Sequence, residues 1–334
     1  MYKKITEFIK SEYKFLLFLV FIYILLNFPL DYYIVVGGGV SDVSSRIKVE
    51  EKYKSKGSFN ISYVTELKGT VMTYLLSYII PSWERESASN FKYNDKESIE
   101  DIEFRSDLDL KTSNGTSKYW AYNLADKPIE ETSSKLYIIT LFGDYKTNLK
   151  IGDEVLSIDG HSYENVLDYK KYMQTKKEND YVDVRVIRNN SEKVIKSKLY
   201  KYKDQLVLGV VLQFVKEYET TPNVDIKFKS SESGPSGGLI TTLEIYNQLT
   251  KKDLTKGYTI AGTGTIEVDG TIGEIGGVEH KLLGASQADT DIFLVPSGNN
   301  YKEAMKYKKS KKLKIKVIEV KNIKDAINKL EDLK

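Results

Sequence analysis

The stretch from Ser231 to Leu249 constrains the fold of this chain most strongly. It opens with Ser-Glu-Ser-Gly-Pro-Ser-Gly-Gly, and apolar residues then recur at helical spacing. Two small neighbours, Gly234 and Gly237, leave the hydroxyl of Ser236 uncovered, and Pro235 fixes the angle at which the chain enters the helix. The free N–H groups and the positive dipole end of a helix stabilise negative charge. The pattern therefore predicts a tight turn that presents a serine hydroxyl where an oxyanion would be stabilised.

Two further glycine-rich motifs follow this turn. The first is Gly262-Thr263-Gly264, and the second, over residues 273–283, reads Gly-Glu-Ile-Gly-Gly-Val-Glu-His-Lys-Leu-Leu. In the second motif Lys281 lies on a predicted helix that begins just after a glycine pair. Because burial disfavours an ammonium group, a lysine among apolar neighbours can stay neutral and accept a proton from a serine hydroxyl. Taken singly, Ser236 is equally compatible with a helix N-cap and Lys281 with an exposed helix lysine.

The chain contains no cysteine and only two histidines, His161 and His280. Cysteine nucleophiles and disulfides are therefore excluded, and a zinc site usually needs three or four ligands drawn mostly from His and Cys. We expect no metal and no cofactor. His280 is adjacent to Lys281, but neighbouring helix positions point about 100° apart, so both cannot face Ser236.

The three motifs, in this order, resemble the proteolytic domain of Lon, a family of serine–lysine peptidases. The resemblance extends from about residue 206 to the C-terminus. It implies that Ser236 is the nucleophile, that Lys281 is its general base and that Thr263 hydrogen-bonds the lysine. Two positions depart from the family pattern, because Ser233 and Thr265 stand where Lon has acidic residues. Glu232 is adjacent to the first of these.

The sequence gives no indication of a nucleotide or nucleic-acid partner. It contains no Gly-x-x-x-x-Gly-Lys-Ser/Thr motif, so the ATPase module of Lon has no counterpart here. The net charge of +3 is small, and acidic and basic residues are interspersed. We expect peptides or already extended proteins as substrates. Lon relatives form rings, so a homo-oligomer is compatible with the resemblance.

The N-terminal residues predict a membrane anchor. Residues 1–14 are polar and lysine-rich, and residues 15–31 form an apolar run near the lower limit of the roughly 17–25 residues that span a bilayer. We expect a cytoplasmic tail over 1–14, a single transmembrane helix over 15–31, and an extracellular catalytic domain at the cell membrane, because lysines mark the cytoplasmic side. A cleaved signal peptide and a buried core helix are the alternatives. No Ala-x-Ala-like cleavage site follows the run.

Residues 32–130 are expected to contribute early strands and helices to the proteolytic domain. Strand-like runs cover 33–36 and 58–65, and residues 71–80 have a helical pattern. Residues 85–130 are polar, and we expect a long charged helix with a loop. This opening resembles that of the membrane-anchored, PDZ-containing branch of Lon-like peptidases, in which early strands join the proteolytic domain across an inserted module.

Residues 131–203 predict that inserted module. Leu149–Gly160 reads Leu-Lys-Ile-Gly-Asp-Glu-Val-Leu-Ser-Ile-Asp-Gly, which resembles the central hairpin of a PDZ domain. We expect a strand over 136–141, a helix over 162–174 and a strand over 181–187. The resemblance implies that an extended peptide adds to an exposed strand edge. The residues predicted for that edge are Tyr137, Ile138, Ile139, Thr140 and Leu141. A β-rich spacer without a ligand is the alternative, because the loop 142–148 lacks the usual Gly-Leu-Gly-Phe form.

Residues 204–334 alternate between predicted strands and helices, which indicates an α/β layered domain. Asp269-Gly270 predicts a hairpin turn. Strands are expected over 206–215, 225–229, 257–260, 265–268, 291–295 and 314–320, and helices over 237–249, 278–287, 300–309 and 322–333. The predicted fold class is an α/β Lon-type proteolytic domain with an inserted, mostly-β PDZ-like domain and an N-terminal transmembrane helix.

These patterns lead to one functional hypothesis and two alternatives. The chain is predicted to be a membrane-anchored, ATP-independent serine endopeptidase with a Ser-Lys dyad and a PDZ-like module that recruits or gates peptide substrates. A catalytically silent, membrane-anchored peptide-binding adaptor is the main alternative, and the Ser236/Lys281 pair argues against it. A chaperone-like sensor that uses both modules only for binding is the third.

Overall fold

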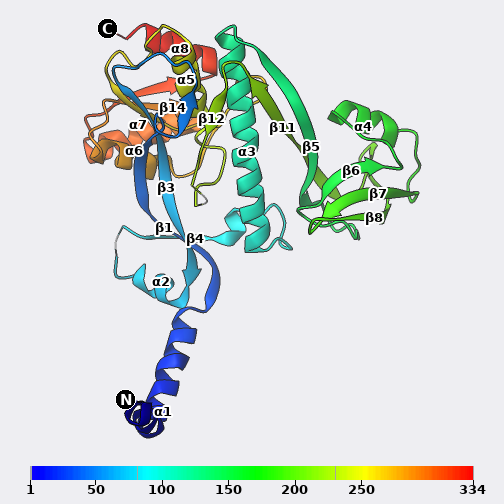
Figure 1. Cartoon of the computed structure of the whole chain (residues 1–334), viewed down its shortest axis with the longest axis vertical. Coiled ribbons are helices and arrows are strands. Elements are labelled where there is room, and N and C mark those ends of the chain that lie inside the picture. The colour runs from blue at the N-terminus through cyan, green and yellow to red at the C-terminus, as the bar shows by residue number, and fades with distance from the viewer. Residues whose placement is uncertain (1, 81, 230, 334) are drawn as a thin grey trace. The chain divides into compact units, whose positions relative to one another are not determined.

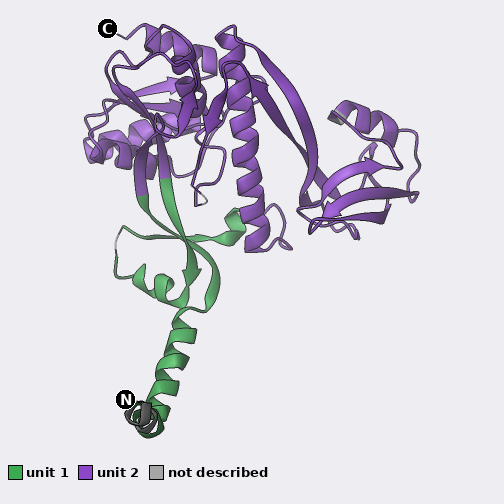
Figure 2. Ribbon diagram, viewed as in Figure 1, with its two compact units in different colours: residues 1–37, 64–91 green, residues 38–63, 92–334 purple. Residues whose placement is uncertain are grey.

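The computed structural model describes residues 2–80, 82–229 and 231–333. The chain forms two compact units, which Figure 2 colours separately on the cartoon of Figure 1. Unit 1 comprises Met1–Gly37 and Val64–Phe91, and unit 2 comprises Gly38–Tyr63 and Lys92–Lys334. Strands β1 (Pro29–Asp42) and β3 (Ser58–Thr70) contribute residues to both units.

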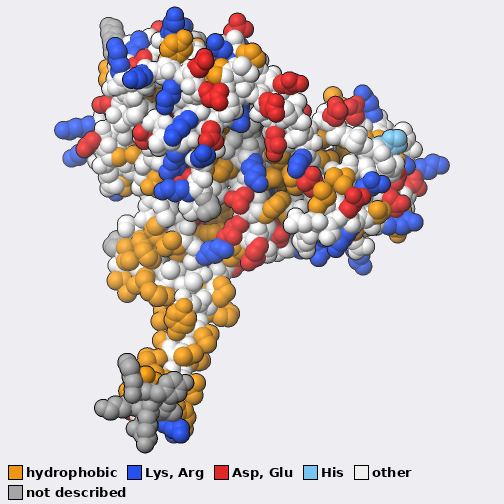
Figure 3. All heavy atoms as spheres, in the orientation of Figure 1, with side chains coloured by type: hydrophobic (Ala, Val, Ile, Leu, Met, Phe, Trp, Pro, Cys, Tyr) orange, Lys and Arg blue, Asp and Glu red, His pale blue; other side chains and the backbone are white. Residues whose placement is uncertain are grey.

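Unit 1 contains helix α1 (Tyr2–Leu26), helix α2 (Val71–Leu76), strand β4 (Glu84–Ser87) and the short 3-10 helix η1 (Ala88–Asn90). Strand β4 pairs antiparallel with β1. Helix α2 begins at a capping box, in which Thr70 and Thr73 exchange side-chain to backbone hydrogen bonds. Hydrophobic side chains gather over α1 and α2 on the face that Figure 3 shows.

The transmembrane helix predicted over residues 15–31 is not found. Helix α1 ends at Leu26, so its apolar part is confined to residues 15–26, and strand β1 begins at Pro29. Proline lacks a backbone N–H and disfavours helical geometry in the residue before it, here Phe28, which explains why the helix stops. Among the described residues, none of the helices combines the length and the apolar character that crossing a membrane requires.

The main sheet of unit 2 is built around strand β13 (Thr259–Gly262). This strand pairs in parallel with β3 on one side and with β14 (Ile292–Pro296) on the other, and β14 pairs in parallel with β15 (Lys316–Val320). The predicted strand over 225–229 is the shorter β12 (Val224–Ile226), which pairs with β2 (Ile47–Val49). The arrangement agrees with the predicted α/β layers.

Helices cover both faces of this sheet (Figure 1). Alternate residues of β14 decide which helix packs where, because successive side chains of a strand point to opposite faces. Ile292 and Leu294 lie in one apolar cluster with α5 (Gly238–Leu249) and α8 (Ile323–Glu331). Phe293 and Val295 lie in a second cluster with α6 (Val278–Gln287) and α7 (Asn299–Lys311). All residues of α5 are buried, which makes it the central helix of the domain.

The strand predicted over 265–268 is an irregular loop. Its backbone is held by single hydrogen bonds, from the Thr265 N–H to Gly273 (3.3 Å) and from the Glu267 N–H to Thr271 (2.9 Å). The turn predicted at Asp269-Gly270 is present, and Gly270 has the positive φ of 84° that such turns need. Two isolated hydrogen bonds do not form the regular ladder of a β-strand, so the prediction of a strand here was wrong. The prediction of the turn is confirmed.

The polar region 85–130 contains helix α3 (Ile99–Leu124), as predicted. The helix begins at Ser98, whose side chain accepts the Asp101 N–H, while the Asp101 carboxylate accepts the Ser98 N–H. Acidic residues in its first turn, Glu100 and Asp101, favour the positive end of the helix dipole. This capping box explains why the helix begins where it does.

A second, antiparallel sheet follows α3. Its strands are β5 (Ile129–Leu141), β6 (Glu154–Ile158), β7 (Tyr181–Arg188), β8 (Ser191–Lys198) and β11 (Val210–Thr220), in the order β11-β5-β6-β7-β8. Helix α4 (Val166–Met173) and the short strands β9 (Tyr200–Tyr202) and β10 (Gln205–Val207) complete this part. The sequence predicted a domain boundary between residues 203 and 204, but β11, which follows that boundary, pairs with β5 along its whole length.

Candidate active site

The predicted turn lies at the amino end of α5. The helix begins at Gly238 with Gly237 as its N-cap, and the Gly238 N–H bonds the Pro235 carbonyl at 3.1 Å. No side chain fits at Gly238, since a Cβ atom there would lie 2.6 Å from Ser113 Oγ and 2.7 Å from a methyl carbon of Ile266. The turn can therefore be built only with a glycine at this position, and it leaves Ser236 partly exposed.

The Thr263 motif holds the Ser236 turn at the carboxyl end of β13. The Ser236 carbonyl accepts the Gly264 N–H at 2.8 Å and the Thr263 hydroxyl at 3.2 Å. The Leu239 N–H returns a bond to the Gly264 carbonyl at 3.1 Å. Thr263 is fully buried. The structure thus brings together Ser236 and Thr263, and the threonine hydroxyl acts on the main chain of the predicted nucleophile.

Two backbone N–H groups of the turn remain available for a ligand. The first N–H groups of α5, those of Gly238 and Leu239, already have acceptors. Within the described segments of the chain, the N–H groups of Ser236 and Gly237 have no acceptor. An oxyanion next to Ser236 would find these donors at the positive end of the α5 dipole.

Lys281 lies in the first turn of α6, which begins after Gly277 in the left-handed conformation (φ 67°). Its side chain is only 4% exposed, whereas the neighbouring His280 is half-buried. Val278 and Leu282 of the same helix belong to the apolar cluster that includes Ala261 of β13. Ala261 of β13 therefore packs with the lysine-bearing helix, and Thr263, just after the end of β13, contacts the serine-bearing turn.

Two residues at or beside the positions that depart from the Lon pattern, Glu232 and Thr265, form polar contacts. Glu232, next to Ser233, forms an ion pair with Arg46 and accepts the Lys229 N–H at 2.8 Å. Thr265 donates its hydroxyl to Glu267 at 2.6 Å. Glu232 thus fastens the loop that precedes the turn.

Helix α3 contributes contacts to the turn that the sequence did not indicate. Ser113 donates its hydroxyl to the Pro235 carbonyl at 3.2 Å, one residue before Ser236. Ser117 donates to the Gly238 carbonyl at 3.2 Å. The available signal was the recurrence of serine at positions 106, 113 and 117, which lie on one face of a helix.

One buried carboxyl lies behind the turn on α5. Glu244 is 3% exposed and accepts the side-chain amide of Gln248 at 2.5 Å. Burial raises the pKa of Glu244, and the negative charges of Asp42 and Asp253 act in the same direction. This group couples the stability of the helix to pH.

The edge predicted for peptide binding is not an edge of the second sheet. Strand β5, which carries Tyr137–Leu141, lies between β11 and β6. The two edge strands are β11 and β8, and no other described strand pairs with the outer side of β11. It begins after Gly209, whose φ is 74°, in the sequence Leu208-Gly209-Val210-Val211. This stretch is closer to the Gly-Leu-Gly-Phe form than the loop 142–148, and it was the signal that sequence reasoning missed.

One face of β11 is turned toward α4. Val210, Leu212 and Phe214 pack on the same apolar cluster as Tyr169 and Tyr172 of α4. Burial raises the pKa of Tyr169 to about 12, which is consistent with an apolar environment beside this strand.

Comparison with known proteins identifies two regions of the chain. Residues 225–331 match the family described as the Lon protease C-terminal proteolytic domain. Residues 144–199 match the PDZ domain family. The first range contains Ser236, Thr263 and Lys281, and the second contains the Leu149–Gly160 segment with strand β6. The chain therefore carries a Lon-type proteolytic domain and a PDZ domain.

Similar proteins cover only part of the chain. The Lon protease of Neorickettsia sennetsu is 31% identical over 98 residues, and that of Aster yellows witches'-broom phytoplasma is 28% identical over 99 residues. These matches span 29% and 30% of this chain and 12% of each relative. A PDZ domain of an SdrC-like protein from Listeria monocytogenes is 21% identical, covering 25% of this chain and 92% of that structure, with a TM-score of 0.23.

Proposed function

We propose that this chain is a serine endopeptidase that uses Ser236 as nucleophile and Lys281 as general base and that requires no ATP. The burial of Lys281 carries the proposal, because a fully buried lysine is rare in proteins and burial is the condition under which a lysine can serve as a base. The match of residues 225–331 to a peptidase family supports it. Burial away from water disfavours the ammonium form and favours the neutral amine that a base must be.

In the proposed reaction, the Ser236 hydroxyl attacks the carbonyl carbon of a peptide bond as the Lys281 amine accepts its proton. The N–H groups of Ser236 and Gly237 stabilise the oxyanion that develops. The ammonium group then returns the proton to the leaving amine. Water attacks the resulting ester with Lys281 again acting as base, which releases the acid product and restores Ser236.

Ser236→Ala tests this proposal directly. The substitution deletes one oxygen at a helix mouth, so we expect unchanged thermal unfolding and complete loss of cleavage of an unfolded protein substrate. A fluorophosphonate probe should label the wild-type chain at Ser236 and leave the variant unlabelled. The matched control is Ser233→Ala, three residues earlier and exposed, which should cleave and be labelled as the wild type is.

Two outcomes would contradict the proposal. If the Ser236→Ala variant still cleaves the substrate, Ser236 is not the nucleophile. An inactive, unlabelled wild-type protein that still binds peptides would instead favour the adaptor, in which both domains serve only for binding.

We also propose that the PDZ domain binds an extended peptide along β11 by strand addition. The outer edge of β11 and its contacts beside α4 support this location. Gly209→Ala tests it, since the left-handed φ of 74° is strained for any other residue and a Cβ would lie 2.8 Å from Tyr145 Cβ. Peptides with free C-termini should bind the wild type and lose affinity for Gly209→Ala.

The matched control is Gly160→Ala, at the turn after β6. It has a similar φ of 80° but no atom within 4 Å of the added Cβ. Equal binding of free and amidated peptides would reject recognition of the carboxylate. Equal loss in both glycine variants would show that strain, and not the edge of β11, reduces binding.

A further inference from the structure

Helix α3 holds the turn that carries Ser236 from outside the region matched to the Lon family. Its residues contact the turn on both sides of the nucleophile. The three hydrogen bonds are Gly234 N–H to the Ser106 carbonyl (2.9 Å), Ser113 Oγ to the Pro235 carbonyl (3.2 Å) and Ser117 Oγ to the Gly238 carbonyl (3.2 Å). Because a helical turn takes about 3.6 residues, the three serines lie on one face of α3.

The opposite face of α3 lies on the second sheet. Leu108 is 3% exposed and packs with Ile139 of β5 and Val215 of β11. Gly115 lies so close to β11 that a Cβ atom would come within 2.7 Å of the Lys216 carbonyl oxygen. The helix therefore packs on β5 and on β11, an edge strand of this sheet.

A polar contact joins β11 to α3 as well. The side-chain amide of Gln213 donates to Asp109 Oδ1 at 3.1 Å and to Thr112 Oγ1 at 3.0 Å. Burial raises the pKa of Asp109, while the hydrogen bond from Gln213 lowers it. The hydrogen bond from Gln213 therefore offsets part of the cost of burying the Asp109 carboxylate.

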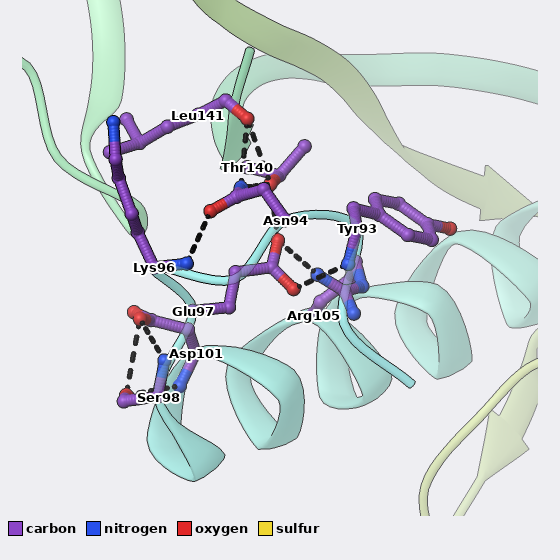
Figure 4. Close-up of polar contacts among 9 residues, drawn as sticks. All are labelled: Tyr93, Asn94, Lys96, Glu97, Ser98, Asp101, Arg105, Thr140 and Leu141. Atoms are coloured by element: carbon purple, nitrogen blue, oxygen red, sulfur yellow. Dashed lines mark hydrogen bonds and ion pairs between the residues drawn. The ribbon is translucent and has the colours of Figure 1, made fainter. Parts of the chain in front are cut away.

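A buried polar cluster attaches the start of α3 to the end of β5 (Figure 4). Glu97 accepts Arg105 Nη1 at 2.8 Å and also accepts the Thr140 hydroxyl. Asn94 donates to Thr140 Oγ1 and to the Leu141 carbonyl, both at 2.9 Å. Helix α3 is therefore attached to the sheet at its first turn and again along β11.

We propose that Ser113 and Gln213 are positioning residues for the reaction at Ser236, with α3 carrying the effect of Gln213 from strand β11 of the second sheet to the turn. This inference rests on the proposed peptidase function. Ser113 acts directly on the carbonyl that precedes Ser236. Gln213 bonds α3 and not the turn. It acts by fixing the position of α3 relative to β11, and α3 in turn holds the Ser236 turn.

The test uses the full chain and a short quenched-fluorescence peptide with an amidated C-terminus, so that carboxylate capture does not contribute. Ser113→Ala and Gln213→Met should each lower kcat by about 2- to 10-fold, the range of one hydrogen bond, with KM unchanged. Because both residues act through one helix, the kcat of the double variant should fall by less than the product of the two single fold-losses.

Two control variants distinguish a loss of positioning from a general destabilisation of the protein. Thr116→Val removes a hydroxyl that bonds only the Thr112 carbonyl within α3, and Gln205→Met changes an exposed glutamine of β10. Both should keep the wild-type kcat. If Gln213→Met fails to fold, Thr112→Val replaces it, because it removes one acceptor of the same amide.

The outcomes distinguish this inference from the proposed function. An active wild type with an unchanged kcat in Gln213→Met would overturn the role of α3 and leave the peptidase intact. Multiplicative losses in the double variant would show two independent effects and would also overturn it. An inactive wild type that no serine probe labels would overturn the peptidase itself.

Discussion

The hydroxyl of Thr263 donates to the backbone carbonyl of Ser236 at 3.2 Å. The resemblance to Lon led us to expect this threonine beside the Lys281 amine, and the structure shows a hydrogen bond from its hydroxyl to the main chain of Ser236. The Ser236 carbonyl also accepts the Gly264 N–H, so the turn has two attachments to the end of β13.

Thr263→Val should lower kcat by about 3- to 10-fold, because it keeps the shape of the side chain and removes one hydrogen bond. Thr263→Ser, which keeps the hydroxyl, should stay within about twofold of the wild type. Steady-state kinetics on an unfolded substrate decide between them. Equal activity in both variants would mean that the hydroxyl does not position the turn.

Lys281→Met should abolish cleavage and leave the thermal unfolding temperature equal to or above that of the wild type. The thioether side chain is apolar and of similar length, so it fills the same buried space without an ionisable group. Lys281→Arg should also be inactive, since a guanidinium stays protonated. The exposed Lys302→Met is the control and should keep full activity. Substantial cleavage by Lys281→Met would make His280 the next base to test.

Glu244→Gln should stabilise the protein at neutral pH and not under acidic conditions. Burial raises the pKa of Glu244 in the folded state above its ordinary value. The favourable contribution of the Glu244 carboxyl to the free energy of unfolding is therefore complete below its pKa in the unfolded chain, about 4.3. This contribution is lost as the pH rises through the pKa of Glu244 in the folded protein. Urea unfolding at about pH 3.5 and pH 7.5 measures the difference. Glu303→Gln, exposed on α7, controls for the change in net charge.

Arg105→Met should reduce the free energy of unfolding by about 3–5 kcal/mol, because it leaves the Glu97 carboxylate buried without its cation. Both side chains of this pair are at most 6% exposed. The control is Lys171→Met. Lys171 forms an exposed ion pair with Asp168 at 3.2 Å, which should contribute less than about 1 kcal/mol to the free energy of unfolding. A loss in Arg105→Met no larger than in the control would contradict this account of the cluster.

Local features of the sequence predicted local structure well. The apolar spacing after Gly238 predicted α5, and the Leu149–Gly160 stretch predicted the PDZ domain that the family match includes. The long helix in the polar region 85–130 was also expected. Such features depend on residues within one or two turns of each other, so a single segment contains the information.

The helix predicted over residues 15–31 differs from the observed elements because one apolar run serves two of them. Residues 15–26 belong to α1, while Pro29 and Leu30 belong to β1. An apolar residue fits a helix or a strand equally well, and pairing with other strands decides between them. The strand predicted over 265–268 failed for the converse reason, since no neighbouring strand pairs with it.

The sequence by itself predicted which three residues, Ser236, Thr263 and Lys281, form the candidate site, and it predicted the helices beside Ser236 and Lys281. Only the tertiary structure decided that β11, and not β5, is an edge strand of the second sheet, and that α3 contacts both this strand and the Ser236 turn. The alternation of Val210, Leu212 and Phe214 predicts a strand with two faces, but it does not name the neighbouring strand. That choice depends on the burial and hydrogen bonding of segments far apart in the chain, which no local pattern encodes.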